Sequence, residues 1–243
     1  MNFTDRTGRE PRDLTQWLYN EMVWNAQNDP SVKQMQILNA LSSLCADSDI
    51  TQILDKVAAF AIFYGQVHNG ARWDFKDEIG IKIGPGITLC TTSGCHTDME
   101  YSIPGNIFFG YIGMASGFSA SELKFGAGFA EKNDPAHNSN SDEYVGPYHG
   151  ITDKSSADPV EWNWGDEPSD NVAVTLGIRM WIQHRERLTL SQFKDMLGSV
   201  IAQLDHLSPR RQPVGPAVAL SWPYHVGYFN NTGNVYNITT EAQ

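Results

Sequence analysis

The chain has 243 residues, of which 41% are hydrophobic, and a formal net charge of −11 at pH 7. This length and apolar content suffice for one sizeable core in a single domain, and no run reaches the roughly 18 apolar residues of a membrane span. Because 17 Lys and Arg residues stand against 28 Asp and Glu residues, the chain lacks the basic footprint of a nucleic-acid-binding protein, and we expect neither a nucleic-acid partner nor membrane insertion.

Helices fill the first part of the chain. Residues 1–12 are polar and charged, show no secretory signal peptide, and form an N-terminal extension. Apolar residues at helical spacing predict helices over 13–28, 31–46 and 50–67, and Pro11 and Asp13 provide an N-terminal signal for the first of them. The third helix is apolar on two sides, which is typical of a central buried helix.

A small β part follows, and then further helices. The stretch IGIKIGPGITLCTT (79–92) alternates and breaks at 84–86, which predicts a β-hairpin. Periodicity predicts helices over 102–118, 119–132, 170–185 and 190–207, with glycines that permit close helix–helix approach and a capping box at Ser119-x-x-Glu122. Residues 131–170 are predicted to be a long acidic loop.

These elements predict a mainly α protein of the α+β type, with one helical domain over 13–208 and a small β-hairpin or sheet. The Pro-, Asn- and Tyr-rich residues 209–243 form a C-terminal extension, with a short strand or two, that packs on this domain.

The three cysteines leave the redox state of the chain open. Cys90 and Cys95 have a spacing that suits a small disulfide loop, whereas Cys45 falls in a helical pattern typical of a buried thiol. No second Cys/His pair has zinc-ligand spacing, and no HExxH, GxSxG or Walker motif is present, so the sequence indicates no metal and no cofactor.

Glu21 interrupts the apolar face of the first helix. Leu14, Leu18 and Met22 mark that face, and Trp17 and Trp24 flank the carboxyl group on the helical wheel. A buried Glu requires a partner, so Glu21 either pairs with an Arg or caps a neighbouring helix within the core, or it is a general acid. In the second case apolar walls disfavour its charged form, and it donates a proton near neutral pH. Asn25, one turn further on, would then orient a substrate group.

A general acid needs a second group, and the sequence offers several carboxylates. Asp98 is attractive because it follows the predicted hairpin, so that a helix-borne Glu would face a hairpin-borne Asp across a cleft, an arrangement that suits glycoside hydrolysis. Its other interpretation is a solvated turn residue. Asp170 is explained by the start of a helix, where an acidic residue favours the dipole. The remaining candidates are Asp74, Glu100, Asp166 and Glu167.

Four motifs, in order, resemble the bacterial polymorphic toxin type 44 family over roughly residues 15–185. GNIFFGYIGMASGFSASELKFGAGFAE (105–131) resembles the family signature, which reads N-I-H-Y-G-Y-V-G followed by a Gly/Ala-rich run, G-F-S and A-G. The other matches are WLYNEMVWNAQNDPSVKQMQILNA (17–40), ARWDFK (71–76) and GDEPSDNVAVTLGIRMW (165–181).

The resemblance implies a toxin domain at the end of a secreted bacterial effector, with a cognate immunity protein that protects the producer. RNase activity was proposed for the family, and a lysozyme-like activity on the cell wall has also been suggested. In this chain Phe108 and Phe75 stand where we expect the family's histidines, whereas Glu21 and Asn25 match its first motif. Ser102 stands where the family often has an acidic residue, with Asp98 and Glu100 nearby.

We therefore hypothesise a secreted antibacterial hydrolase, a muramidase that is lysozyme-like in general organisation and acts on peptidoglycan in the periplasm or cell wall of a target cell. Glu21 is the predicted general acid and Asp98 the predicted nucleophile, base or charge stabiliser. The predicted substrate-binding residues are Asn25, Trp73, Asp74, Glu100, Asn106 and Tyr111, of which Glu100 and Asp74 are also substitutes for Asp98.

Two alternatives remain open. A metal-independent RNase toxin would depend on His96 or His149, and the acidic composition argues against it. A non-catalytic binding derivative is supported by Phe75 and Phe108 in place of histidines.

Overall fold

The computed structural model describes residues 13–44, 50–84, 86–133, 166–207, 228–229 and 235–236. The chain divides into two units, Met1–Arg210 and Arg211–Gln243. The first unit contains α1 (Thr15–Asn28), α2 (Pro30–Leu44), α3 (Ile50–Val67), α4 (Phe75–Lys82), β1 (Gly86–Cys90), β2 (Cys95–Glu100), α5 (Ile103–Ala115), α6 (Ala120–Asn133), α8 (Pro168–His184), a short 3-10 helix (Arg185–Arg187) and α9 (Leu190–Leu207). The predicted mainly α fold with a small sheet is thus confirmed.

In the second unit the structure describes one antiparallel strand pair. Tyr228 of β3 (Tyr228–Phe229) lies opposite Tyr236 of β4 (Val235–Tyr236). The predicted domain bounds of 13–208 and 209–243, and the packing of the second of these segments on the first, stay predictions.

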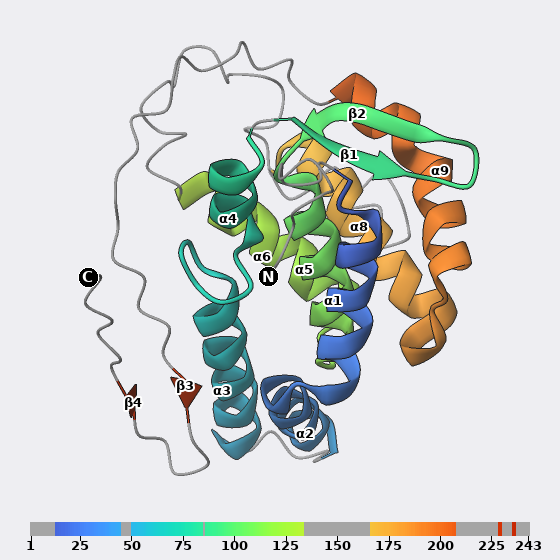
Figure 1. Cartoon of the computed structure of the whole chain (residues 1–243). Coiled ribbons are helices and arrows are strands. Elements are labelled where there is room, and N and C mark those ends of the chain that lie inside the picture. Colours follow the sequence, from blue (N-terminus) through green and yellow to red (C-terminus); the bar gives the residue numbers. More distant parts are fainter. Residues whose placement is uncertain are drawn as a thin grey trace. The chain divides into compact units, whose positions relative to one another are not determined.

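Helix α5 is the centre of the first unit. It contacts α1, α2, α4, α6 and α8, and Figure 1 shows it (green) with α1, α6 and α8 around it. Ten of its residues are buried, among them Ile107, Phe108 and Tyr111. Its closest neighbour is α8, because a Cβ added at Gly110 would lie 2.2 Å from the Val174 carbonyl oxygen, and one added at Gly177 would lie 2.0 Å from that of Ile107. The predicted close helix approach at glycines is therefore confirmed.

The prediction that residues 50–67 form a helix is confirmed, but the prediction that this helix is central and buried is wrong. The helix bounds agree with the structure, but α3 packs against α2 through one face only, with Ala59 and Phe63 buried. The opposite face carries Ile50, which is 76% exposed, and Tyr64, which is 69% exposed. The central position belongs to α5.

The β-hairpin starts later than the alternating pattern predicted. Residues 75–82 form α4, because the Asp74 side chain accepts a hydrogen bond from the Lys76 backbone N–H (3.2 Å) and caps the helix. Gly84, with a φ of +102°, then ends it. Strands β1 and β2 pair antiparallel, with Ile87 opposite Met99 and a bulge before Leu89.

The hairpin is closed at its tip by a disulfide bond and is joined to the start of α1 at the same end. A disulfide bond links Cys90 to Cys95, which resolves the state of this pair, whereas Cys45 lies outside the described residues. The Cys90 backbone N–H donates to the Thr15 hydroxyl (2.6 Å), and the Leu14 N–H donates to the Thr88 carbonyl (3.0 Å). None of the helices within the described ranges is both long and apolar enough to cross a membrane.

Candidate functional site

The largest cluster of motif residues lies around a cavity of about 520 Å³. We call it the aromatic–acidic cavity, because its wall combines aromatic rings with carboxyl groups from α3, α4, α5, α6 and the start of α8. Trp73, Asp74 and Asn106, which the sequence predicted to bind substrate, all line it. Its aromatic residues are Phe60, Phe63, Tyr64, Trp73, Phe75, Phe109 and Phe129.

The turn before α4 places the first of these residues. Both Asp74 carboxylate oxygens accept backbone hydrogen bonds, one from Lys76 N–H and one from Gly70 N–H (2.8 Å). This cap holds Trp73, which is only 3% exposed and lies with its ring centroid 5.8 Å from that of Phe108 in an edge-to-face contact. Asp74 thus has a structural role that the sequence did not reveal.

Two buried carboxyl groups line the polar side of the cavity. Asp166 is 4% exposed and Asp170 is 6% exposed. Asp170 accepts a hydrogen bond from the Ser102 hydroxyl (3.2 Å), and the Lys76 ammonium nitrogen lies 3.5 Å from its other oxygen. These two contacts join α8 to Lys76 of α4 and to Ser102, the residue before α5, and fix the position of the Asp170 carboxylate.

Asn106 lies on the α5 side of the same cavity and is 9% exposed. Among the described residues, no acceptor lies within hydrogen-bonding reach of its amide nitrogen. A buried donor without an acceptor costs stability, and such groups require an explanation in a folded protein. A role in ligand binding is one such explanation.

Glu21 and Asn25 lie on α1 and do not line the cavity. The Asn25 amide donates to the Glu21 carboxylate (3.1 Å) and, at the same time, its oxygen accepts from the Arg72 guanidinium (3.2 Å). Arg72 also forms an ion pair with buried Asp29, and its guanidinium lies 5.9 Å from the centroid of the Trp73 ring. Glu21 is therefore linked through Asn25 and Arg72 to one wall of the cavity.

The expected apolar walls around Glu21 form only in part. Trp17 packs edge-to-face on Phe75, with ring centroids 5.0 Å apart, but Trp24 is 55% exposed. Glu21 itself is half-buried. Its described partner is an amide rather than the arginine or second carboxylate that the sequence left open.

The other predicted residues occupy different places. Asp98 is exposed on β2 with a φ of +59°, and Glu100 at the end of that strand is 5% exposed. Tyr111 is fully buried, and its hydroxyl donates to the Arg185 carbonyl (2.7 Å). Burial, with the nearby Tyr19 and Glu186, raises the pKa of Tyr111. None of these three predicted residues lines the cavity, and their roles stay predictions.

The two phenylalanines at the expected histidine positions contact each other. Phe75 and Phe108 are 4% and 0% exposed, and their ring centroids lie 4.8 Å apart in an edge-to-face arrangement. They therefore contribute apolar packing beside the cavity. His96 is half-buried on β2, and His149 lies outside the described residues.

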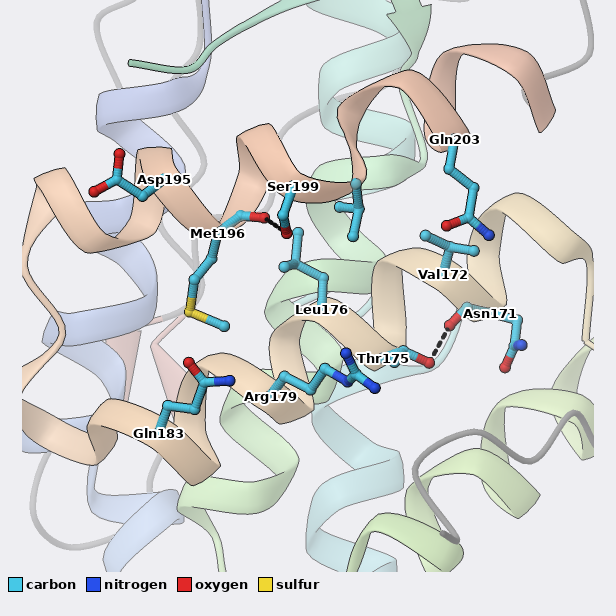
Figure 2. Close-up of a pocket in the computed structure, with 11 residues that line it drawn as sticks. Asn171, Val172, Thr175, Leu176, Arg179, Gln183, Asp195, Met196, Ser199 and Gln203 are labelled. Atoms are coloured by element: carbon cyan, nitrogen blue, oxygen red, sulfur yellow. Dashed lines mark hydrogen bonds between the residues drawn. The ribbon is translucent and has the colours of Figure 1, made fainter. Parts of the chain in front are cut away.

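A second cavity of about 440 Å³ lies between α8 and α9 (Figure 2). Met196 extends from α9 toward Arg179 and Gln183 of α8, whereas Asp195 points away. None of the residues that the sequence predicted for the site lines this cavity. Within the part of the chain that the structure describes, no group of three or more His, Cys, Asp or Glu side chains could hold a metal ion.

A family model described as bacterial toxin 44 matches residues 62–183 of the 243-residue chain. The chain belongs to the bacterial toxin 44 family. No match was found among curated proteins or among solved structures.

The toxin 44 match contains the aromatic–acidic cavity almost completely. Every residue that lines it except Phe60 falls within 62–183, whereas Glu21 and Asn25 precede the matched range. The motif GDEPSD made Asp170 a candidate in the sequence, where its place at a helix start explained it. Its place on the cavity wall, next to Lys76 and Ser102, appears only in the structure.

Proposed function

We propose that this toxin 44 domain is a glycoside hydrolase that cleaves the glycan strands of peptidoglycan, and that the aromatic–acidic cavity is its active site. The observation that carries the proposal is the presence of buried Asp166 and Asp170 in the same cavity as seven aromatic side chains. Aromatic faces pack against the apolar faces of sugar rings, and a pair of carboxyl groups performs the acid and base steps of glycoside hydrolysis.

We assign the two carboxyl groups different roles. Asp170 is held in place by the Ser102 hydroxyl and the Lys76 ammonium group, and it would act as a nucleophile, a base or a stabiliser of positive charge on the sugar. Asp166 is also buried and lines the same cavity, and it would act as the acid that donates a proton to the leaving group. Asn106 and Trp73 would bind and orient the sugar.

In this proposal Glu21 is a positioning residue. It holds Asn25, which with Asp29 fixes Arg72 next to Trp73. The catalytic pair of Glu21 and Asp98 predicted from the sequence remains the competing arrangement for the same reaction, and variants of the two pairs distinguish them.

The family also suggests where the enzyme acts. As a member of a bacterial toxin family, the domain would be delivered to the periplasm or cell wall of a competing cell. A cognate immunity protein would protect the producer by blocking the enzyme.

A cell-wall turbidity assay with mass spectrometry of the released fragments tests the proposal. We expect wild type to release fragments with new reducing ends, and Asp166→Asn and Asp170→Asn to lose at least about 100-fold in rate. Asp98→Asn is the matched control and should retain its rate. Glu21→Gln should raise KM more than it lowers kcat.

Three results would contradict the proposal in different ways. The active site would be the pair predicted from the sequence if Glu21→Gln and Asp98→Asn were inactive while Asp166→Asn and Asp170→Asn were active. Degradation of RNA that depends on His96, without cell-wall products, would indicate the nuclease alternative. Wild type without activity on either substrate would indicate a binding derivative.

A further inference from the structure

The outer face of α3 is an apolar seam that the described elements cover only at one edge, where the Phe60 ring contacts Phe118 (ring centroids 4.9 Å apart). Its side chains, 39–76% exposed, are Ile50, Ile53, Leu54, Val57, Phe60 and Tyr64. None of them is charged. A helix with one face in the core and an apolar second face requires a second contact, because exposed apolar area of this kind is unfavourable in water.

The spacing of the seam residues matches the packing of one helix on another. Ile50, Val57 and Tyr64 recur every seven residues, and Ile53 and Phe60 fall three residues after the first two of them. These are the a and d positions of a coiled coil, where side chains insert between those of a partner helix. The 18 residues of α3 extend over about 27 Å, so the seam offers several layers of such contacts.

The area of the seam is close to what a dimer requires. A large side chain exposes roughly 200 Å² when free, so the six seam residues present on the order of 700 Å². The largest apolar patch on a monomer is about 300–600 Å², whereas each partner in a standard interface contributes about 800 Å².

We propose that the α3 seam is the interface of a homodimer, in which α3 packs antiparallel against α3 of a second copy. A two-fold axis at Val57 makes the seam complementary to itself, with Ile50 opposite Tyr64 and Leu54 opposite Phe60. The two charged residues of α3 lie outside the seam. Lys56 points to Glu122 (2.8 Å) and the Asn39 side-chain oxygen (2.8 Å), and Asp55 is half-buried. A lipid surface fits less well, since membrane-bound amphipathic helices carry Lys and Arg beside their apolar face.

The dimer would lie next to the aromatic–acidic cavity, because Phe60 and Tyr64 belong to both the seam and the cavity wall. The inference does not depend on which reaction the cavity catalyses.

Sedimentation of the full chain and of two charge variants tests the interface. We expect wild type to be a dimer, and Val57→Glu to be a monomer whose dissociation constant is raised at least about 100-fold, since it places two carboxylates at the two-fold axis. Ile182→Glu on α8 is the matched control, because Ile182 is 51% exposed outside the seam, and it should remain a dimer. Circular dichroism verifies that both variants fold.

A cysteine at the axis gives an independent measurement. Val57→Cys should form a reversible disulfide-linked dimer under mild oxidation, unlike wild type or Ile182→Cys. A monomeric wild type in which the cysteine of Val57→Cys resists thiol labelling would overturn the proposal in favour of a segment of the chain itself covering the seam. A monomer that binds neutral phosphatidylcholine vesicles through Val57 would overturn it in favour of a lipid surface. A dimer that both Val57 variants leave unchanged would place the interface elsewhere.

Discussion

Glu122 joins the start of α6 to α3. Its carboxylate accepts from the Ser119 backbone N–H (2.8 Å), which confirms the predicted capping box, and forms an ion pair with Lys56 (2.8 Å). Burial by itself raises the pKa of Glu122, but the hydrogen bonds from Lys56 and Ser119 and the charge of Lys56 outweigh it, so the pKa lies below its usual value of 4.5.

The lowered pKa of Glu122 makes part of the stability depend on pH. Because the folded-state pKa is below the unfolded one, the contribution of Glu122 is complete above the unfolded value and is lost as the pH falls through the folded value. We expect the free energy of unfolding to fall more steeply below pH 4.5 in wild type than in Glu122→Gln. Urea unfolding at several pH values measures this difference. Glu78→Gln, which removes the ion pair with Lys82 within α4, is the control, and equal slopes for wild type and Glu122→Gln would contradict the prediction.

A substitution at Asn106 is expected to affect stability and activity in different directions. If its amide nitrogen binds substrate, Asn106→Leu removes a buried donor that has no acceptor among the described residues, so the free energy of unfolding should stay equal or rise by about 1 kcal/mol. Activity on cell walls should fall roughly 10-fold, since one polar contact of about 1.4 kcal/mol is lost. Thermal unfolding and the turbidity assay measure the two effects.

The control for Asn106 is Ser116→Ala. The Ser116 hydroxyl is also buried and lacks a described partner, but Ser116 does not line the cavity. It should leave activity unchanged. An Asn106→Leu protein with full activity would show that Asn106 does not contact the substrate.

At the scale of elements, the contact between α5 and α8 depends on two glycines. A methyl group at Gly110 meets the backbone of α8 rather than a flexible side chain, so the two helices must move apart. Gly110→Ala should therefore cost about 3 kcal/mol and lower Tm by roughly 10 °C.

Gly65→Ala on α3 is the matched control, because no atom lies within 4 Å of the added methyl group. It should raise stability by up to about 1 kcal/mol, as alanine favours the helix. Calorimetry measures the Tm of both variants. A Gly110→Ala protein as stable as Gly65→Ala would contradict the prediction that α5 and α8 are in close contact at Gly110.

At the scale of the whole molecule, local patterns predicted the helices better than the site. The bounds of α3 and α9 agree with the structure because their apolar periodicity is sustained and their ends carry turn or capping residues. The pattern failed at α4, where IGIKI alternates like a strand but the Asp74 cap starts a helix. It also failed to separate α3 from α5, since both are largely apolar and only the packed structure shows which is central.

The sequence identified those cavity residues that lie within a recognisable motif, as with Trp73, Asp74 and Asn106. Asp170 was weighed and explained locally, because its partners Lys76 and Ser102 are 94 and 68 residues away in sequence. Helical spacing likewise identified Glu21 as unusual but could not reveal that Asn25 and Arg72 would occupy the space beside it.

The disulfide bond between Cys90 and Cys95 makes the stability of the chain depend on the redox state of its surroundings. A disulfide across so short a loop contributes about 2 kcal/mol, and it persists only where thiols are oxidised. Since this bond borders the contact between Cys90 and Thr15, its opening loosens the anchor of α1 as well as the hairpin. The same polypeptide is therefore easier to unfold in a reducing environment than in an oxidising one.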